Sequence, residues 1–290
     1  MKKTFLYAGT SILFWSTVAT VSKLLLNTLD TYQVLMFSAF FAALALLVVN
    51  VITGKIRLLK KYSLKDYVIT LLIYMPGTFL YYVFLYSGTA RMNASQAFII
   101  NYLWPIMSVI FACIVLKEKI TARKGIAFAL SFLGVITVVG KELLSFEANM
   151  IFGAVLCVLA AVSYGLFTAL SRKWSYDYQL SMMLSFFSSS LMTLIINLVR
   201  GSECNVGLPQ ILGFAWNGIF VMALATVTWA LALNSGGTAK VSNLAYVTPF
   251  LSLVWTALIL KEPIELLSIA GLLLIVLGIF IQLKSPRKKL

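Results

Sequence analysis

The side chains that carry acid–base and metal chemistry are scarce in this chain of 290 residues. It contains no His, and none of its nine Asp and Glu residues falls in the middle of a long apolar segment. General acid–base catalysis and metal binding by His and carboxylate clusters therefore lack their usual groups. The G-x-x-x-x-G-K-[ST] loop that cradles nucleotide phosphates is absent as well. These observations predict a protein that is not an enzyme and that holds no cofactor and no metal.

Apart from charges within the first three residues of a segment, Lys23 is the one charged residue inside an apolar segment, and it lies within about a turn of the segment's end. A charge at membrane depth is unfavourable, and it marks a functional residue by default. Two roles are open: Lys23 anchors the segment by reaching towards water, or it contacts a substrate carboxylate. The position near the segment end favours the anchor.

Aromatic and amide side chains are the remaining candidates for binding chemistry. Asn101, Trp104 and Ser108 follow Asn93 and Ala97 at spacings of three or four, so all five share one face of a helix. An amide beside aromatic faces suits a cavity that holds a small molecule. The alternative is that these rings pack against neighbouring helices or form interfacial belts. The candidate substrate-binding residues are Trp15, Tyr81, Tyr82, Asn101, Tyr102, Trp104, Tyr164, Trp229 and Tyr246.

The composition places these residues in a membrane. With 61% apolar and 11% charged residues, the chain has too little polar surface to cover a water-soluble globule of its length. The net charge of +14 comes from short basic clusters between apolar runs, which is the membrane pattern and excludes nucleic acid as a partner.

Ten apolar segments are long enough to cross a bilayer, and all must be helical because lipid cannot satisfy open strand edges. Their ranges are 4–26, 33–53, 66–87, 93–116, 122–140, 148–170, 179–199, 213–234, 241–260 and 264–283. We therefore predict an all-α polytopic membrane protein.

An internal repeat organises these segments. Residues 101–118 read N-Y-L-W-P-I-M-S-V-I-F-A-C-I-V-L-K-E, and residues 245–262 read A-Y-V-T-P-F-L-S-L-V-W-T-A-L-I-L-K-E. Tyr102 and Tyr246 lie 144 positions apart, as do Pro105 and Pro249, and the offset extends into the next segment. A period near half the chain indicates a duplication. We expect two five-helix halves, residues 1–143 and 144–290.

The repeated prolines and the repeated ends of the motif have predicted roles. Pro105 and Pro249 should kink their helices in the middle and act as hinges or as fixed bends. Glu118 and Glu262, each after a Lys, should cap helix ends or form ion pairs. Gly134, which recurs as Gly278, should allow two helices to approach closely.

The distribution of Lys and Arg predicts the orientation. With a cytoplasmic N-terminus, eighteen basic residues lie inside and four outside. The outside residues are Arg91, Lys141, Arg200 and Lys261. Because each half has an odd number of helices, the second half enters the membrane upside down. This five-plus-five inverted-topology repeat is typical of secondary transporters, whose substrate site lies near the midplane between the halves.

The paired P-x-x-S-x(7)-L-K-E stretches make the whole chain resemble the ten-helix EamA-type branch of the drug/metabolite transporter superfamily. Trp15-Ser16, residues 101–105, residues 246–249 and Lys261-Glu262-Pro263 are similar to those of its bacterial aromatic amino acid exporters. The resemblance implies a multi-pass protein of the bacterial cytoplasmic (inner) membrane, with both termini cytoplasmic and a central cavity. In two places the chain departs from the family. Lys117 and Lys261 replace a loop glycine that is common there, and residues 33–53 lack an arginine that many members carry.

The interior also limits the substrate. It lacks the several cations that a polyanion would need and the deep carboxylate typical of cationic-drug carriers. A neutral or zwitterionic amphiphile remains. The resemblance implies that such small metabolites are exported, amino acids including aromatic ones among them, and the inverted repeat implies alternating access. The alternative is export of hydrophobic or aromatic organic cations, held by cation–π contacts. A lipid-handling or scaffold protein that does not transport is the third possibility. The expected partners are the small-molecule substrate and the lipid bilayer, and the oligomeric state is left open, with a monomer sufficient.

Overall fold

The computed structural model describes residues 2–145, 147–174, 176–236 and 244–283. Every regular element in these ranges is helical. In chain order they are α1 (Lys2–Ser16), α2 (Val18–Leu26), α3 (Thr31–Ile52), the 3-10 helix η1 (Lys55–Lys61), α4 (Leu64–Met75), the π-helix η2 (Pro76–Leu80), α5 (Tyr81–Thr89), α6 (Ala94–Asn101), α7 (Trp104–Val115), α8 (Ala122–Val138), α9 (Gly140–Ser145), α10 (Ala148–Lys173), α11 (Tyr178–Val199), α12 (Leu208–Ala215), the π-helix η3 (Trp216–Leu224), α13 (Ala225–Gly236), α15 (Val247–Trp255), the π-helix η4 (Thr256–Leu260) and α16 (Leu266–Leu283).

Several of these elements join into continuous membrane spans. Seven spans in the described ranges are long and apolar enough to cross a bilayer, among them Leu64–Thr89 (α4, η2 and α5) and Ala94–Val115 (α6 and α7). Val247–Leu260 and Leu266–Ile281 are shorter apolar helices, and α8 has 17 residues. These helices account for the ten predicted segments, except that residues 241–243 of the ninth lie outside the described part of the chain. The predicted all-helical membrane fold is confirmed.

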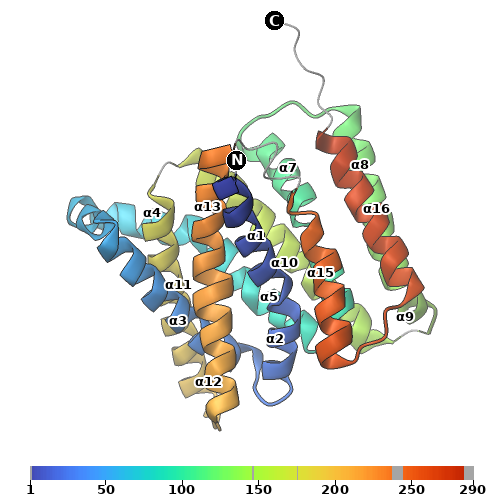
Figure 1. Cartoon of the computed structure of the whole chain (residues 1–290), viewed down its shortest axis with the longest axis horizontal. Coiled ribbons are helices and arrows are strands. Elements are labelled where there is room, and N and C mark those ends of the chain that lie inside the picture. Colours follow the sequence, from blue (N-terminus) through green and yellow to red (C-terminus); the bar gives the residue numbers. More distant parts are fainter. Residues whose placement is uncertain (1, 146, 175, 237–243, 284–290) are drawn as a thin grey trace, which may run out of the picture.

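The helices form one bundle with connections at two ends (Figure 1). α8 packs beside α16 along one side, α3 packs beside α11 along the other, and α1, α10 and α15 lie between them. We call the end that carries the start of α1 and the α7–α8 connection the proximal end. The distal end carries the α2–α3 turn and the connection from η4 to α16.

The two halves share their irregular features. The first half breaks its fourth span at Tyr102 and Leu103, and α15 of the second half begins directly after a turn at Ala245 and Tyr246. The repeat offset of 144 also relates the five residues of the π-helix η2 to the last five residues of the π-helix η3. Lys117 and Lys261 both have a positive φ, 56° and 59°. The duplication therefore extends to backbone conformation.

Small residues determine how closely helices pack. Hydrocarbon gives no hydrophobic drive for helix association, so close contact relies on small side chains. A Cβ at Gly134 of α8 would lie 2.7 Å from the carbonyl oxygen of Gly271 in α16. A Cβ at Gly278 would lie 2.7 Å from the carbonyl oxygen of Ala127. The close approach predicted for Gly134 and Gly278 is confirmed.

Candidate functional site

A cavity of about 90 Å³ lies between the two halves of the chain. Both halves contribute to its wall, which is mainly aromatic. Its lining residues are Trp15, Val18, Tyr81, Tyr82, Phe98, Asn101, Tyr102, Trp104, Tyr164, Val221, Trp229, Ala245 and Thr248. No charged side chain belongs to this lining.

Eight of the nine residues predicted to bind substrate line this cavity. The exception is Tyr246, which is 8% exposed and packs its ring against Phe280, with 4.7 Å between the centroids. Its neighbours Ala245 and Thr248 do line the cavity. The predicted placement of Tyr246 in the cavity wall is therefore wrong in this structure.

Aromatic rings form the wall by packing on each other across helices. Trp15 of α1 contacts Trp229 of α13 at 5.2 Å between centroids. Trp104 of α7 meets Tyr164 of α10 edge to face, at 5.2 Å and 80°. Tyr164 also lies 4.9 Å from Tyr81. Such contacts favour defined ring positions, so the wall is an ordered surface of ring faces and edges.

Asn101 provides the main polar feature of the wall. Its Nδ2 donates to the Tyr81 hydroxyl at 3.0 Å. Its Oδ1 is buried without a hydrogen-bond partner, and the residue is only 2% exposed. A buried acceptor without a partner is unfavourable. Because Asn101 belongs to the cavity lining, this oxygen is the candidate acceptor for a donor group on a bound molecule.

The helix break after Asn101 gives the wall its shape. Pro105 has no N–H, so the Asn101 carbonyl lacks the donor that a continuous helix would supply. Tyr102 instead turns, and its hydroxyl donates to the Ala245 carbonyl across the two halves. The expected kink in mid-helix is a full interruption. Pro105 lies in the first turn of α7, and Pro249 is the third residue of α15.

A second break, at Thr17 between α1 and α2, positions Trp15. The Trp216 Nε1 donates to the Thr17 hydroxyl at 2.8 Å, and the Trp255 Nε1 donates to the Ser16 hydroxyl at 3.0 Å. Both hydroxyls donate back to carbonyls of α1, of Phe14 and Leu13 at 2.7 Å. These bonds fix the chain directly after Trp15.

Lys23 does not line the cavity. Its Nζ donates to the carbonyls of Thr89 and Met92, each at 2.8 Å. The structure therefore shows Lys23 bound to the backbone of a neighbouring turn at the distal end, outside the cavity lining.

Some lining residues were missed by sequence reasoning. The repeat offset of 144 relates Ala245 to Asn101 and Thr248 to Trp104, so the duplication could have indicated both. Val18 and Phe98 lie three residues from Trp15 and Asn101, a spacing that predicts the same face of a continuous helix. Val221 has no such signal, because it lies in a π-helix whose register a regular period does not predict.

The fold and the cavity between its halves define a membrane carrier, and the sequence comparisons agree. The chain belongs to the EamA-like transporter family, whose profile matches residues 2–140 and again residues 151–283. An uncharacterized transporter of Clostridium kluyveri is 26% identical over 298 residues, covering 99% of this chain and 95% of that protein.

Two further likenesses are more distant. The S-adenosylmethionine uptake transporter of Rickettsia prowazekii is 22% identical over 178 residues, covering 61% of this chain and 57% of that protein. A solved crystal structure matches with a TM-score of 0.70 and 17% identity, covering 98% of this chain and 100% of that one. The second likeness supports the fold. This chain is therefore a multi-pass membrane transporter of the EamA type.

Proposed function

We propose that the chain exports small neutral or zwitterionic amphiphiles, aromatic amino acids among them, by alternating access through the aromatic cavity. The observation that carries the proposal is the wall itself: aromatic rings surround one amide whose Oδ1 has no partner. The rings would pack on an aromatic side chain. The Asn101 oxygen would accept a hydrogen bond from an ammonium or amide group.

The similarity to bacterial aromatic amino acid exporters points to the same substrates. Asn101, Tyr102 and Trp104, which belong to the motif that carries this similarity, all line the cavity. The direction of transport belongs to the proposal as well. The Rickettsia relative is named for the opposite direction, uptake, so export rests on the similarity to the aromatic amino acid exporters.

A second candidate is transport of organic cations. Aromatic rings attract a cation through their faces, and the cavity lining contains no fixed positive charge to repel it. S-adenosylmethionine, for which the Rickettsia relative is named, is itself a sulfonium cation that bears an amino acid group. The two candidate functions predict transport of different test molecules, quaternary ammonium ions in one case and aromatic amino acids in the other.

The orientation is also part of the proposal. We propose that the proximal end faces the cytoplasm of a bacterial inner membrane, because that end carries most of the basic residues. A Cys introduced at Lys60 or Arg123 should be protected from an impermeant thiol reagent in intact cells. Labelling at either position would overturn the orientation and the direction of export together.

A counterflow screen separates the two substrates. Liposomes that contain the purified protein are loaded with each of the twenty amino acids in turn, and then with tetramethylammonium and tetraethylammonium. Trans-stimulation by phenylalanine, tyrosine or tryptophan supports the first proposal, and trans-stimulation by the quaternary ions alone supports the second. No counterflow with any probe would contradict both.

A further inference from the structure

Two charged side chains hold the turn between α5 and α6, residues 90–93, at the distal end. Lys23 donates to the Thr89 and Met92 carbonyls on one side of the turn. On the other side, Glu262 Oε1 accepts from the Ala94 N–H at 2.7 Å. Its Oε2 accepts from the Ser95 N–H at 3.0 Å and from the Ser95 hydroxyl at 2.8 Å. The turn belongs to the first half and Glu262 to the second, so this contact joins the halves.

Glu262 supplies a cap that α6 lacks in its own sequence. Asn93 occupies the N-cap position, but its side chain makes no capping hydrogen bond. Ala94 and Ser95 are 0% and 5% exposed, so water cannot easily replace the carboxylate on their N–H groups. A carboxylate at a helix N-terminus and an ammonium at a helix C-terminus both complement the helix dipole. Glu262 and Lys23 therefore stabilise opposite sides of one turn.

The held segment leads directly to the cavity. α6 is eight residues long. Its first residues bind Glu262, and its last residue is Asn101, next to the break at Tyr102. A displacement of the distal end of α6 would therefore move the amide and the phenol of the cavity wall.

Glu118 is the repeat counterpart of Glu262 and has a matched backbone. Each glutamate follows a lysine with positive φ. Each donates its N–H to a carbonyl six residues earlier, Glu118 to Ala112 and Glu262 to Thr256, both at 3.4 Å.

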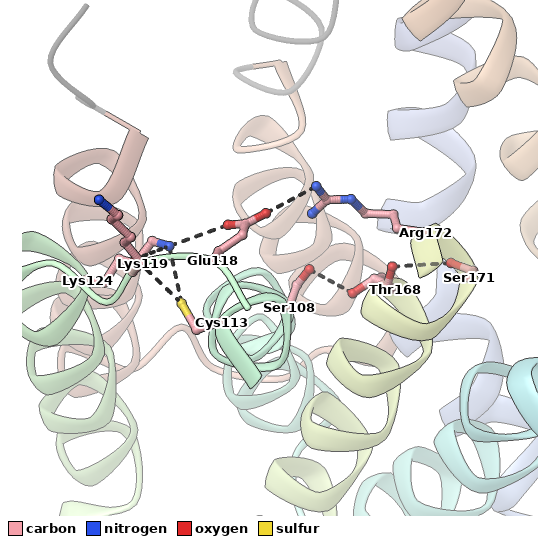
Figure 2. A network of polar contacts seen from close by, with 8 residues as sticks. All are labelled: Ser108, Cys113, Glu118, Lys119, Lys124, Thr168, Ser171 and Arg172. Carbon is pink, nitrogen blue, oxygen red and sulfur yellow. Dashed lines mark hydrogen bonds and ion pairs between the residues drawn. The ribbon is translucent and has the colours of Figure 1, made fainter. Parts of the chain in front are cut away.

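The partners of the two glutamates differ. Figure 2 shows Glu118 between Arg172 of the second half and Lys124, with N–O distances of 3.2 and 3.4 Å. Thus Glu118 is held by charged side chains, whereas Glu262 is docked on a helix of the opposite half.

The side chains between the cavity and the distal end are buried, with Ser22, Leu85 and Thr89 1%, 3% and 2% exposed, so the distal side is closed in this structure. We propose that Glu262 is the distal latch of the transport cycle: it docks on α6 when the distal side is closed and releases α6 when the cavity opens there. The link to transport rests on the proposed function. The docking and release of Glu262 can be measured on the protein with no substrate present.

The test measures access to the cavity. In a background with Cys113→Ser, Cys157→Ala and Cys204→Ser, a reporter Val18→Cys lies in the cavity wall. An impermeant maleimide is applied in proteoliposomes without substrate, separately from each face. The face at which Cys204 of the unmodified chain is labelled defines the distal side, because Cys204 is exposed in the α11–α12 connection.

Glu262→Gln should increase reporter labelling from the distal face about tenfold, because it replaces a charge-assisted contact with a neutral one. Glu265→Gln is the matched control. It removes the same charge three residues away, from an ion pair with Lys141 at 3.6 Å whose side chains are 63% (Lys141) and 22% (Glu265) exposed, and should change labelling less than about twofold. Ser95→Ala removes one of the three hydrogen bonds and should give a smaller increase than Glu262→Gln.

Unchanged labelling in both Glu262→Gln and Ser95→Ala would overturn the latch, as would an equal increase in Glu265→Gln. If Glu262→Gln does not fold, Ser95→Ala decides alone: an increase supports the latch and no change contradicts it. Because no substrate is present, a wrong substrate proposal leaves this result untouched.

Discussion

Replacing Lys117 and Lys261 by glycine should stabilise the protein. Both lysines are exposed and hold left-handed backbone with φ of 56° and 59°. That conformation costs an L-residue about 1–2 kcal/mol, whereas glycine adopts it freely but loses about 0.5–1 kcal/mol more chain entropy on folding. The difference predicts a gain of about 0.5–1 kcal/mol in the free energy of unfolding at each site. The two sites lie at opposite ends of the bundle, so their effects should add.

The assay is thermal unfolding of purified protein in detergent. Each variant should raise Tm by roughly 1–4 °C, and the double variant by about twice as much. Lys119→Gly is the control, because Lys119 lies in the same connection without a positive φ, and it should not raise Tm. A fall in Tm for both Lys117→Gly and Lys261→Gly would refute the argument that these positions are strained.

Three further predictions concern the cavity, the packing and the coupling. Trp104→Ala should lower counterflow of aromatic substrates about tenfold and affect counterflow of small aliphatic substrates less. The control Trp174→Ala lies outside the cavity lining and should change neither. An equal loss for all substrates in Trp104→Ala would exclude a selective pocket. Gly134→Ala should lower Tm, because its Cβ would lie 2.7 Å from the Gly271 carbonyl, whereas Gly125→Ala, with nothing within 4 Å of its Cβ, should not. Substrate flux in liposomes should be unchanged by an imposed pH gradient, since no His or carboxylate lies in the middle of a predicted span to relay protons. Uphill accumulation driven by that gradient alone would contradict this.

Much of the fold follows from the sequence because the duplication repeats local chemistry. Pro105 and Pro249 predicted disturbed helices at equivalent positions, since proline removes the same donor in both halves. The structure adds a turn before each proline, at Tyr102 and Leu103 in the first half and at Ala245 and Tyr246 in the second. It also explains why glycine suits the positions of Lys117 and Lys261: both have left-handed backbone, which glycine adopts without strain.

The site was predicted less completely, for a geometric reason. Residue type and depth indicated eight lining residues, but they could not show that the Tyr246 ring turns to Phe280. Only part of the role of Glu262 was predicted. Its place after a helix predicted capping, whereas the helix it caps, α6, begins 168 residues earlier in the chain. Such contacts depend on how helices from opposite halves meet, which no local pattern encodes.

Binding of the leading counterflow substrate to purified protein, measured by scintillation proximity, tests most directly whether the cavity is the substrate site. Asn101→Leu removes the buried amide at similar volume, and Tyr246→Phe changes a predicted residue that lies outside the lining. We expect Asn101→Leu to weaken binding about tenfold, because the substrate loses one hydrogen bond to a buried acceptor, and Tyr246→Phe to leave it within about twofold. Unchanged binding in Asn101→Leu, or an equal loss in Tyr246→Phe, would contradict the assignment of this cavity.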